Sequence, residues 1–589
     1  MSGLDLGIVG NGTIAALINS RGDYQWACLP RFDGQPVFNQ LLGGGGAFSV
    51  WMEDLASRTQ SYDHNSAILR TRLESRDGAV VEIVDFAPRF ENQGRMFRPA
   101  ALVRRFRVLA GTPRMRITLT PETDWGGRKL KPVRGVNHVR FIDEELGFRV
   151  TTDAPVSYIL SGTSFILDRE AAFILGADES LSDHPEVIAR DWEERTRLYW
   201  KRWARSLAVP FEWQQAVIRA AITLKLCVYE ETGGIVAALT TSVPEHEGSE
   251  RNWDYRYCWI RDAYFTVTAL NRLSGMGTLE HYMRWVRNIV AQSKGGHIQP
   301  VYGIGLEADL TEDIARQLPG YRGMGPVRVG NQAAEHVQHD VYGQVVLGVA
   351  QSFFDTRLMK RPGLTEFEQL EPVGERAFAV HDTPDAGIWE FRTIAHVHTS
   401  SAIMCWAACD RLAKIAAHLG LPARADYWRE RADIIHGTIL EKAWNEEVGA
   451  FTAAFGGEDL DASVLLMAEI GFIDAKDPRY ISTVQVINRD LRDGDHVYRY
   501  KVTDDFGKPK TAFTACTFWL VDALYRIGET EEARRVFEAL LAARNHLGLL
   551  SEDVDTETGE LWGNFPQTYC MVGIINSAAL LSRSWSKSI

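Results

Sequence analysis

The sequence lacks the features that mark a membrane or secreted protein. It contains no run of about 18 apolar residues, the length that an α-helix needs to cross a bilayer. Its first cationic side chain is Arg21, so the N-terminal stretch has no basic start of the kind that secretion signals carry. Its seven cysteines are odd in number and scattered, which does not suit a disulfide framework. We therefore expect reduced, buried thiols in a cytoplasmic protein.

The sequence also lacks an excess of positive charge. The chain has 64 Lys and Arg against 77 Asp and Glu, which gives a formal net charge of −13. Nucleic acids and anionic membranes bind clustered Lys and Arg, so we expect neither as a partner. The composition is otherwise that of an ordinary globular protein, and 589 residues allow two or three domains.

Up to about residue 180, apolar residues alternate with a period near two. Residues 67–90, AILRTRLESRDGAVVEIVDFAPRF, predict two strands around an Asp-Gly turn, and residues 101–122 and 138–160 repeat the plan. Many strands at short spacing with glycine-rich turns favour an antiparallel β-sandwich. We predict this sandwich over residues 1–185.

From residue 186 onward the period changes to three and four, which is typical of helices. We expect a helical linker over residues 186–235 and a further domain over residues 236–589, with about a dozen helices over the whole second half of the chain. Paired helices in that number suit a closed double ring, an α/α toroid. The pattern also permits an open solenoid, although the sequence has no fixed repeat length.

Four of the expected interhelical loops are rich in aromatic and charged residues. They contain the stretches RNWDYRYCWIRDAYF (251–265), DAGIWEFR (385–392), HVYRY (496–500) and GLLSEDVDTETGELWGNFPQ (548–567). Aromatic faces beside carboxylates and arginines suit a sugar, because the C–H face of a pyranose packs on a ring while its hydroxyls need donors and acceptors. Each stretch alone could be a buried aromatic or a solvated turn. Their joint presence points to a carbohydrate site.

Two of these loops carry a carboxylate that could do chemistry, Glu390 and Glu552. Two carboxyl groups on opposite sides of a sugar ring can divide the work of glycoside hydrolysis, one as proton donor and the other as base. Trp389 stands next to Glu390, and we expect its indole to exclude water and favour the protonated acid.

Histidines offer a second, weaker reading. HVH places His396 and His398 two residues apart, and EHVQH places His336 and His339 within one turn. A zinc site needs a third and fourth ligand, and the HExxH order is absent. We therefore expect these histidines to serve structure or substrate hydrogen bonding, and we predict no metal site.

The same stretches, RNWDYRYCWIRDA, GIWE, YRY and LLSEDVDTETGELWGNFPQ, resemble glycoside hydrolase family 15, which contains glucoamylases and trehalases. The N-terminal stretch DLGIVGNGTIAALINSRGDYQWACLPRFDG looks like the β-domain of the prokaryotic members. The resemblance implies an N-terminal β-sandwich followed by an (α/α)6 barrel, an inverting mechanism that releases glucose from a non-reducing α-linked end, and no metal or organic cofactor.

The resemblance also implies roles for single residues. Glu390 matches the general acid and Glu552 the general base of the family. The positions expected at the substrate are Tyr255, Trp259, Arg261, Asp262, Arg328, Asn331, Trp389 and Arg499. Phe391 departs from the fungal pattern, which has a second acidic residue there, and Lys510 and Thr511 replace a Glu-Gly pair common in bacterial relatives.

We expect a glucoamylase-type exo-α-glucosidase acting on a small or soluble α-glucoside. The alternative is a trehalase. A related disaccharide phosphorylase and a non-catalytic sugar-binding protein are less favoured, because neither needs both carboxylates. Linkage preference and oligomeric state stay open.

Overall fold

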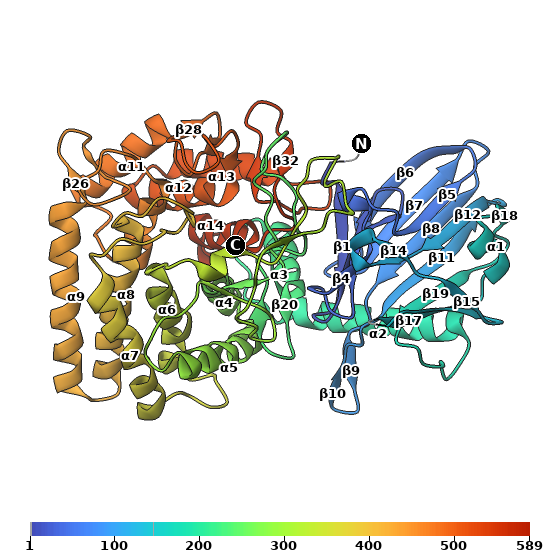
Figure 1. Cartoon of the computed structure of the whole chain (residues 1–589), viewed down its shortest axis with the longest axis horizontal. Helices are drawn as coiled ribbons and strands as arrows, with labels where there is room; N and C mark the ends of the chain where they lie inside the picture. The colour runs from blue at the N-terminus through green and yellow to red at the C-terminus, as the bar shows by residue number, and fades with distance from the viewer. Residues whose placement is uncertain (1–2, 145, 589) are drawn as a thin grey trace.

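The computed structural model describes residues 3–144 and 146–588 and contains a β-domain and a helical domain side by side (Figure 1). In the β-domain, one sheet has the order β1-β2-β3-β5-β12-β18, with β4 paired to β3. Its strands are β1 (Leu6–Gly10), β2 (Ala15–Asn19), β3 (Tyr24–Leu29), β4 (Gln35–Phe38), β5 (Ala47–Met52), β12 (Arg114–Thr120) and β18 (Phe165–Ile166).

The other sheet has the order β15-β16-β17-β19-β11-β8-β7-β6. Its strands are β15 (Pro132–Arg134), β16 (His138–Ile142), β17 (Gly147–Thr152), β19 (Ala171–Gly176), β11 (Leu102–Ala110), β8 (Val80–Phe86), β7 (Leu69–Ser75) and β6 (Leu55–Tyr62). The strand pairs recorded in both sheets are antiparallel, so the predicted antiparallel β-sandwich is confirmed.

The hairpin predicted over residues 67–90 is present. Strands β7 and β8 pair from Leu69 opposite Asp85 to Glu74 opposite Val80. Gly78 in the connecting turn has a φ of +86°, a conformation that glycine adopts without a Cβ clash. The residues after the sandwich form α2 (Pro185–Arg205), and Ile188 and Ala189 of this helix pack on Val84 and its neighbours on the second sheet.

The helical domain is a closed double ring. The inner ring consists of α4 (Ile260–Arg272), α6 (Asp340–Phe354), α8 (Thr399–His418), the η4–α10 segment (Ala462–Leu466 and Met467–Ile470), α12 (Thr514–Ile527) and α14 (Thr568–Leu581). Each contacts the next and α14 returns to α4, which closes the ring and excludes an open solenoid. The outer helices are α3 (Gln214–Leu226), α5 (Met276–Ser293), α7 (Leu364–Val380), α9 (Pro422–Lys442), α11 (Pro478–Asp490) and α13 (Thr530–Ala542).

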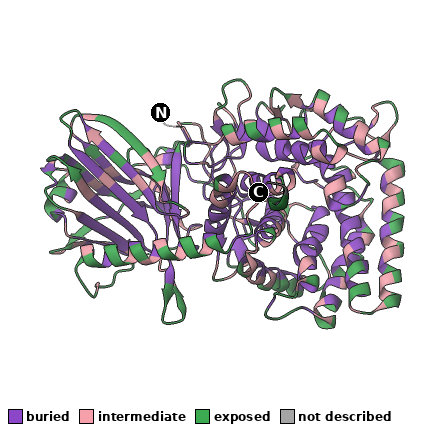
Figure 2. Ribbon diagram, turned by 180° about the vertical axis from the view of Figure 1, so that it is seen from behind, coloured by how far each residue is buried: buried purple, intermediate pink, exposed green. Residues whose placement is uncertain are grey.

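Burial separates the two rings. Helices α6, α8 and α12 are buried on nearly every side, whereas outer helices such as α9 keep an exposed face (Figure 2). A helix that is apolar all round belongs in a core, and an amphipathic one covers it. The expected (α/α)6 barrel is therefore confirmed. Helix α3 lies within the segment predicted as a linker, and it packs against α14 as part of the outer ring.

The remaining elements are short. They include α1 (Val156–Ser161), α15 (Trp585–Ser588), η3 (Gln332–Glu335), β22 (Cys258–Trp259), β23 (Val301–Tyr302), β30 (Ala512–Phe513), β31 (Asp553–Val554) and β32 (Leu561–Trp562). Within residues 3–144 and 146–588, no helix has both the length and the apolar character that crossing a membrane requires. All seven cysteines are free and buried, as predicted.

The β-domain supports the helical domain directly. The indole N–H of Trp26 donates to the Leu239 carbonyl at 2.9 Å. In return, Arg256 reaches the β-domain, where its Nη1 donates to the Gly34 carbonyl at 2.6 Å. Its other nitrogens hold the Asp254 carboxylate, in an ion pair that is almost fully buried. These hydrogen bonds fix the aromatic loop 251–259 against the β-sandwich.

Candidate active site

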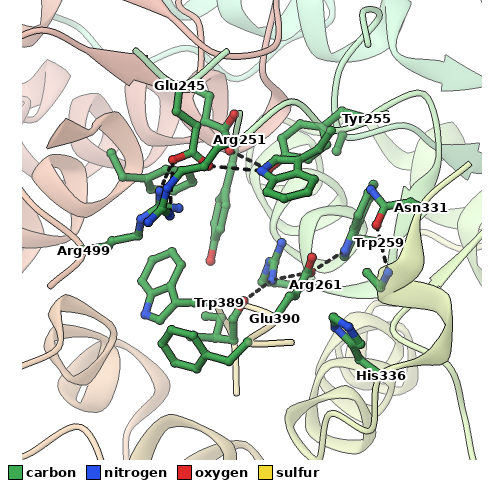
Figure 3. A pocket seen from close by; sticks show the side chains of 18 of the residues that line it. Glu245, Arg251, Tyr255, Trp259, Arg261, Asn331, His336, Trp389, Glu390 and Arg499 are labelled. Carbon is green, nitrogen blue, oxygen red and sulfur yellow. Dashed lines mark hydrogen bonds and ion pairs between the residues drawn. The ribbon is translucent and has the colours of Figure 1, made fainter. Parts of the chain in front are cut away.

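One pocket, with about 800 Å³ of empty space when its open mouth is included, contains most of the residues that the sequence singled out (Figure 3). It is lined by the segments that lead into the N-termini of the inner helices α4, α6, α8, α12 and α14. The sequence-predicted residues on its wall are Tyr255, Trp259, Arg261, Asp262, Asn331, Trp389, Glu390, Arg499 and Glu552. Loops distant in the sequence meet there because a closed ring brings the same ends of its inner helices together.

Glu390 lies in a strained turn on this wall. Its φ of +62° is in the left-handed region, which side chains other than glycine rarely occupy. The turn is held by Glu390 N–H donating to the Gly387 carbonyl at 3.2 Å and Phe391 N–H donating to the Ala386 carbonyl at 3.1 Å. Strain of this kind persists where the surroundings enforce it, and it is concentrated at functional sites.

Two donors hold the Glu390 carboxylate. The indole Nε1 of Trp259 donates to its Oε1 at 2.6 Å, and Nη1 of Arg261 lies 3.4 Å from the same oxygen. Arg261 is fixed in turn by the Ile388 carbonyl at 2.7 Å and by Asp262 at 3.1 Å. Asp262 is buried, and burial raises the pKa of its carboxyl while the guanidinium of Arg261 opposes that shift.

Trp389 is placed differently from the sequence expectation. Its Nε1 donates to Asp461 at 2.7 Å, and its ring packs on Phe513 and Trp519. The indole that bonds Glu390 is therefore Trp259, from another loop, and it acts as a hydrogen-bond donor. Neighbouring residues in this tight turn point in different directions, which sequence adjacency could not show.

Glu552 lies on the same pocket and is buried. The hydroxyl of Tyr255 donates to its Oε1 at 2.6 Å, while its Oε2 has no hydrogen-bond partner among the residues described. Burial and then the negative charge of Glu245 raise the pKa of Glu552, and Tyr255 and Arg499 oppose the shift. A carboxylate with a raised pKa is a stronger base once it has lost its proton.

Two aromatic rings connect the carboxyl groups. Tyr255 and Trp259 meet edge to face with their centroids 5.3 Å apart, and each donates to a different carboxylate. Glu552 and Glu390 are therefore held on one continuous wall with two rings between them. Both rings and both carboxylates line the same pocket.

Glu245 is a pocket residue that the sequence analysis missed. Its carboxylate pairs with Arg499 and accepts from Nε1 of Trp253 at 3.2 Å. Arg499 therefore holds a carboxylate as well as facing the pocket. No sequence signal distinguishes Glu245 within the stretch SVPEHEG, and only the fold brings it to the site.

Glu552 belongs to a group of three buried carboxylates. One oxygen each of Glu245, Glu552 and Asp553 lie within 4.8 Å of one another, a spacing that a metal ion would also allow. The cluster already has positive partners, because Arg499 pairs with Glu245 and Arg251 lies 3.7 Å from the same carboxylate. Thr511, noted as a departure in the sequence, donates to Asp553 at 3.2 Å or to the Glu245 carbonyl at 2.9 Å.

Two residues that we expected to contact substrate, Arg328 and Asn331, bind groups of the protein instead. Arg328 is not among the residues that line the pocket; its guanidinium pairs with Glu312 at 2.7 Å and lies over the Trp253 ring. Asn331 lines the pocket, but its side-chain amide donates to the Asp254 carbonyl and accepts from the Ala333 N–H. The signal for both was a family loop, which fixes the position of a segment and not the direction of each side chain.

None of the four histidines weighed for metal binding belongs to the clusters with metal-ligand spacing in the part of the chain that the structure describes. His339 and His398 are buried, and burial lowers the pKa of each to about 4. His396 is exposed, and His336 lines the pocket.

Comparison with known proteins agrees with this site. The protein-family model for glycosyl hydrolases family 15 matches residues 213–579, which include every pocket residue named above. The chain belongs to glycosyl hydrolase family 15. It is thus an O-glycosyl hydrolase. The model described as trehalase-like, N-terminal, matches residues 5–174, which correspond to the β-domain.

Relatives match over nearly the whole length. A trehalase of Thermoplasma volcanium is 30% identical over 99% of this chain and 94% of its own, and a trehalase of Mycolicibacterium smegmatis is 31% identical over 98% and 91%. Among solved structures, a bacterial glucoamylase complexed with acarbose superposes with a TM-score of 0.72 at 12% identity, over 98% of this chain and 94% of that one. The last likeness concerns the fold alone.

Proposed function

We propose that this protein is an inverting trehalase, which hydrolyses α,α-trehalose to two molecules of glucose. The sequence placed this activity second, behind a glucoamylase-type activity. The observation that carries it is the similarity of about 30% identity to proteins named trehalase, which extends over both domains and includes the β-domain. The glucoamylase structure shares only 12% identity and supports no choice of substrate.

The reaction follows from the two carboxylates. Glu390 donates a proton to the glycosidic oxygen, so the departing glucose leaves as a neutral alcohol. Glu552 removes a proton from a water molecule that attacks the anomeric carbon from the opposite face. An inverting enzyme needs about 6.5–9.5 Å between the two carboxyl groups to admit that water. The Tyr255–Trp259 pair, which bonds one carboxylate at each end, supports such a separation.

Other wall residues bind the glucose that is attacked or support the base. Asp262 and Arg261 offer acceptors and donors that suit the hydroxyls of a terminal glucose. Tyr255 also positions the base, because its hydroxyl fixes one oxygen of Glu552, while the other oxygen has no hydrogen-bond partner among the described residues. The positive charge of Arg499 partly balances the negative charges of the acidic cluster when Glu552 is ionised.

A substrate panel tests the proposal. Purified protein is incubated with trehalose, maltose, maltotriose and isomaltose, with and without inorganic phosphate, and released glucose is measured. We expect trehalose to have the highest kcat/KM and phosphate not to be incorporated into the product. Preference for maltotriose would restore the glucoamylase-type activity, and formation of glucose phosphate would indicate a phosphorylase.

A further inference from the structure

His336 is a pocket residue with unused hydrogen-bonding capacity. It lines the pocket beside Glu390 (Figure 3). Both ring nitrogens are shielded from solvent, and neither has a hydrogen-bond partner within residues 3–144 and 146–588. Buried polar atoms in proteins are nearly always paired, so two unpaired nitrogens on a substrate pocket indicate that a ligand pairs with them.

The backbone around His336 is fixed to the loop that carries the acid. Ala386 N–H donates to the Val337 carbonyl at 2.9 Å, and Nε2 of Gln338 donates to the Gly387 carbonyl at 2.9 Å. His339 N–H donates to Asp385 at 2.8 Å. The backbone that carries His336 is therefore held close to the loop of Glu390, as the support of a binding residue must be.

His336 lies on the acid side of the pocket. The charged groups that act on it are Glu390, Arg392, Glu335 and Asp505, and none of them belongs to the cluster around the base. In the proposed reaction, Glu390 protonates the oxygen between the two sugars, so the space on its far side from the base receives the departing sugar. His336 lines the pocket near Glu390 and is not acted on by the cluster around Glu552, so we assign it to that space.

Other side chains there are already engaged or apolar. The guanidinium of Arg392 pairs with Glu312 at 3.1 Å and lies over the ring of Trp253, and the Arg392 backbone is held by Asp505 at 2.6 Å. Phe391 is a hydrocarbon surface. The leaving-group side thus offers an apolar ring and the imidazole of His336.

We propose that His336 binds a hydroxyl group of the departing sugar and is a specificity-determining residue for the leaving group. This inference rests on the proposed function. A neutral imidazole has one donor and one acceptor, which matches a hydroxyl in either role. Burial lowers the pKa of His336, so the ring is neutral at pH 7 and keeps both roles.

Two variants and two substrates test the role. His336→Ala removes both nitrogens, and His336→Gln keeps a donor and an acceptor. Each is assayed on trehalose and on α-glucosyl fluoride, which has the same glucose to be attacked but no departing sugar. We expect His336→Ala to lower kcat/KM for trehalose by about 10-fold or more, because the sugar hydroxyl is left unpaired, with a change of less than about twofold for the fluoride. His336→Gln should recover most of the loss.

His396→Ala is the matched control, since His396 is an exposed histidine outside the pocket lining. Equal losses of His336→Ala on both substrates, at an unchanged melting temperature, would place His336 at the other sugar and overturn the proposal. Unchanged kcat/KM on trehalose would overturn it as well.

The wild-type protein separates this test from that of the proposed function. If it hydrolyses another α-glucoside and not trehalose, the trehalase proposal fails. The same variants are then compared on that glucoside and the fluoride. A selective loss on the glucoside still supports the role of His336, and equal or no loss overturns it.

Discussion

Removing the charge of Glu245 should move the pH dependence of the reaction. Glu245 and Glu552 have carboxylate oxygens within 4.8 Å, and the charge of Glu245 contributes to the raised pKa of Glu552. Two unit charges at that distance repel by about 3 kcal/mol at an effective dielectric constant of about 20, which Arg499 partly offsets. We therefore expect Glu245→Gln to lower the pKa of the base by about one to two pH units.

The sign of this effect is fixed by the role of Glu552. The base works only when deprotonated. A raised pKa therefore means that activity is lost at a higher pH when the pH is decreased. Glutamine keeps an oxygen that can accept from Trp253, but it removes the charge. The acidic limb of the kcat/KM profile for trehalose, which reports the free enzyme, should therefore shift to lower pH.

The assay compares the full pH profile of wild type, Glu245→Gln and Glu247→Gln. Glu247 is an exposed carboxylate on the same loop and controls for a general change of surface charge. An acidic limb that stays in place or moves to higher pH in Glu245→Gln, at an unchanged melting temperature, would refute the assignment of Glu552 as the base or of Glu245 as its electrostatic neighbour.

Three further predictions concern the acid, its donor and the support of the loop. Glu390→Gln should lower kcat on trehalose by about 10² to 10⁴ and much less on α-glucosyl fluoride, whose leaving group needs no proton, whereas Glu552→Gln should lower both; equal losses for Glu390→Gln would contradict its role as acid. Trp259→Phe removes the 2.6 Å hydrogen bond to Glu390 and should lower kcat/KM for trehalose by about 10-fold, with unchanged kcat/KM as the contradicting result. Arg256→Ala leaves the Asp254 carboxylate buried without its partner and should cost about 3–5 kcal/mol of unfolding free energy in urea denaturation; a loss below about 1 kcal/mol would show that the ion pair does not hold the loop.

The sequence indicated the architecture because periodicity depends on local burial. Alternation with period two predicted the sandwich, and the hairpin of β7 and β8 formed where the Asp-Gly turn placed it. The change to a period of three and four predicted the helices. Ring closure could not be predicted from periodicity, because it depends on the contact of α14 with α4, which are about 300 residues apart.

The site was predictable only in part, for a physical reason. Aromatic loops that precede helices were visible in the sequence, and a ring brings them together. Side-chain direction was not visible. Trp389 turns to Asp461 while Trp259 takes the place beside Glu390, and Arg328 turns to Glu312. Glu245 has no motif around it, since its importance comes from a neighbour more than 300 residues away.

The most direct test of the account is the configuration of the glucose formed from trehalose. Proton NMR spectra are recorded in the first minutes of hydrolysis, before mutarotation brings the anomers to their equilibrium ratio. Attack by a water activated at Glu552, on the face opposite Glu390, predicts one β-glucose and one α-glucose per trehalose cleaved. Formation of α-glucose alone would mean retention of configuration, and it would contradict the division of labour between the two carboxylates.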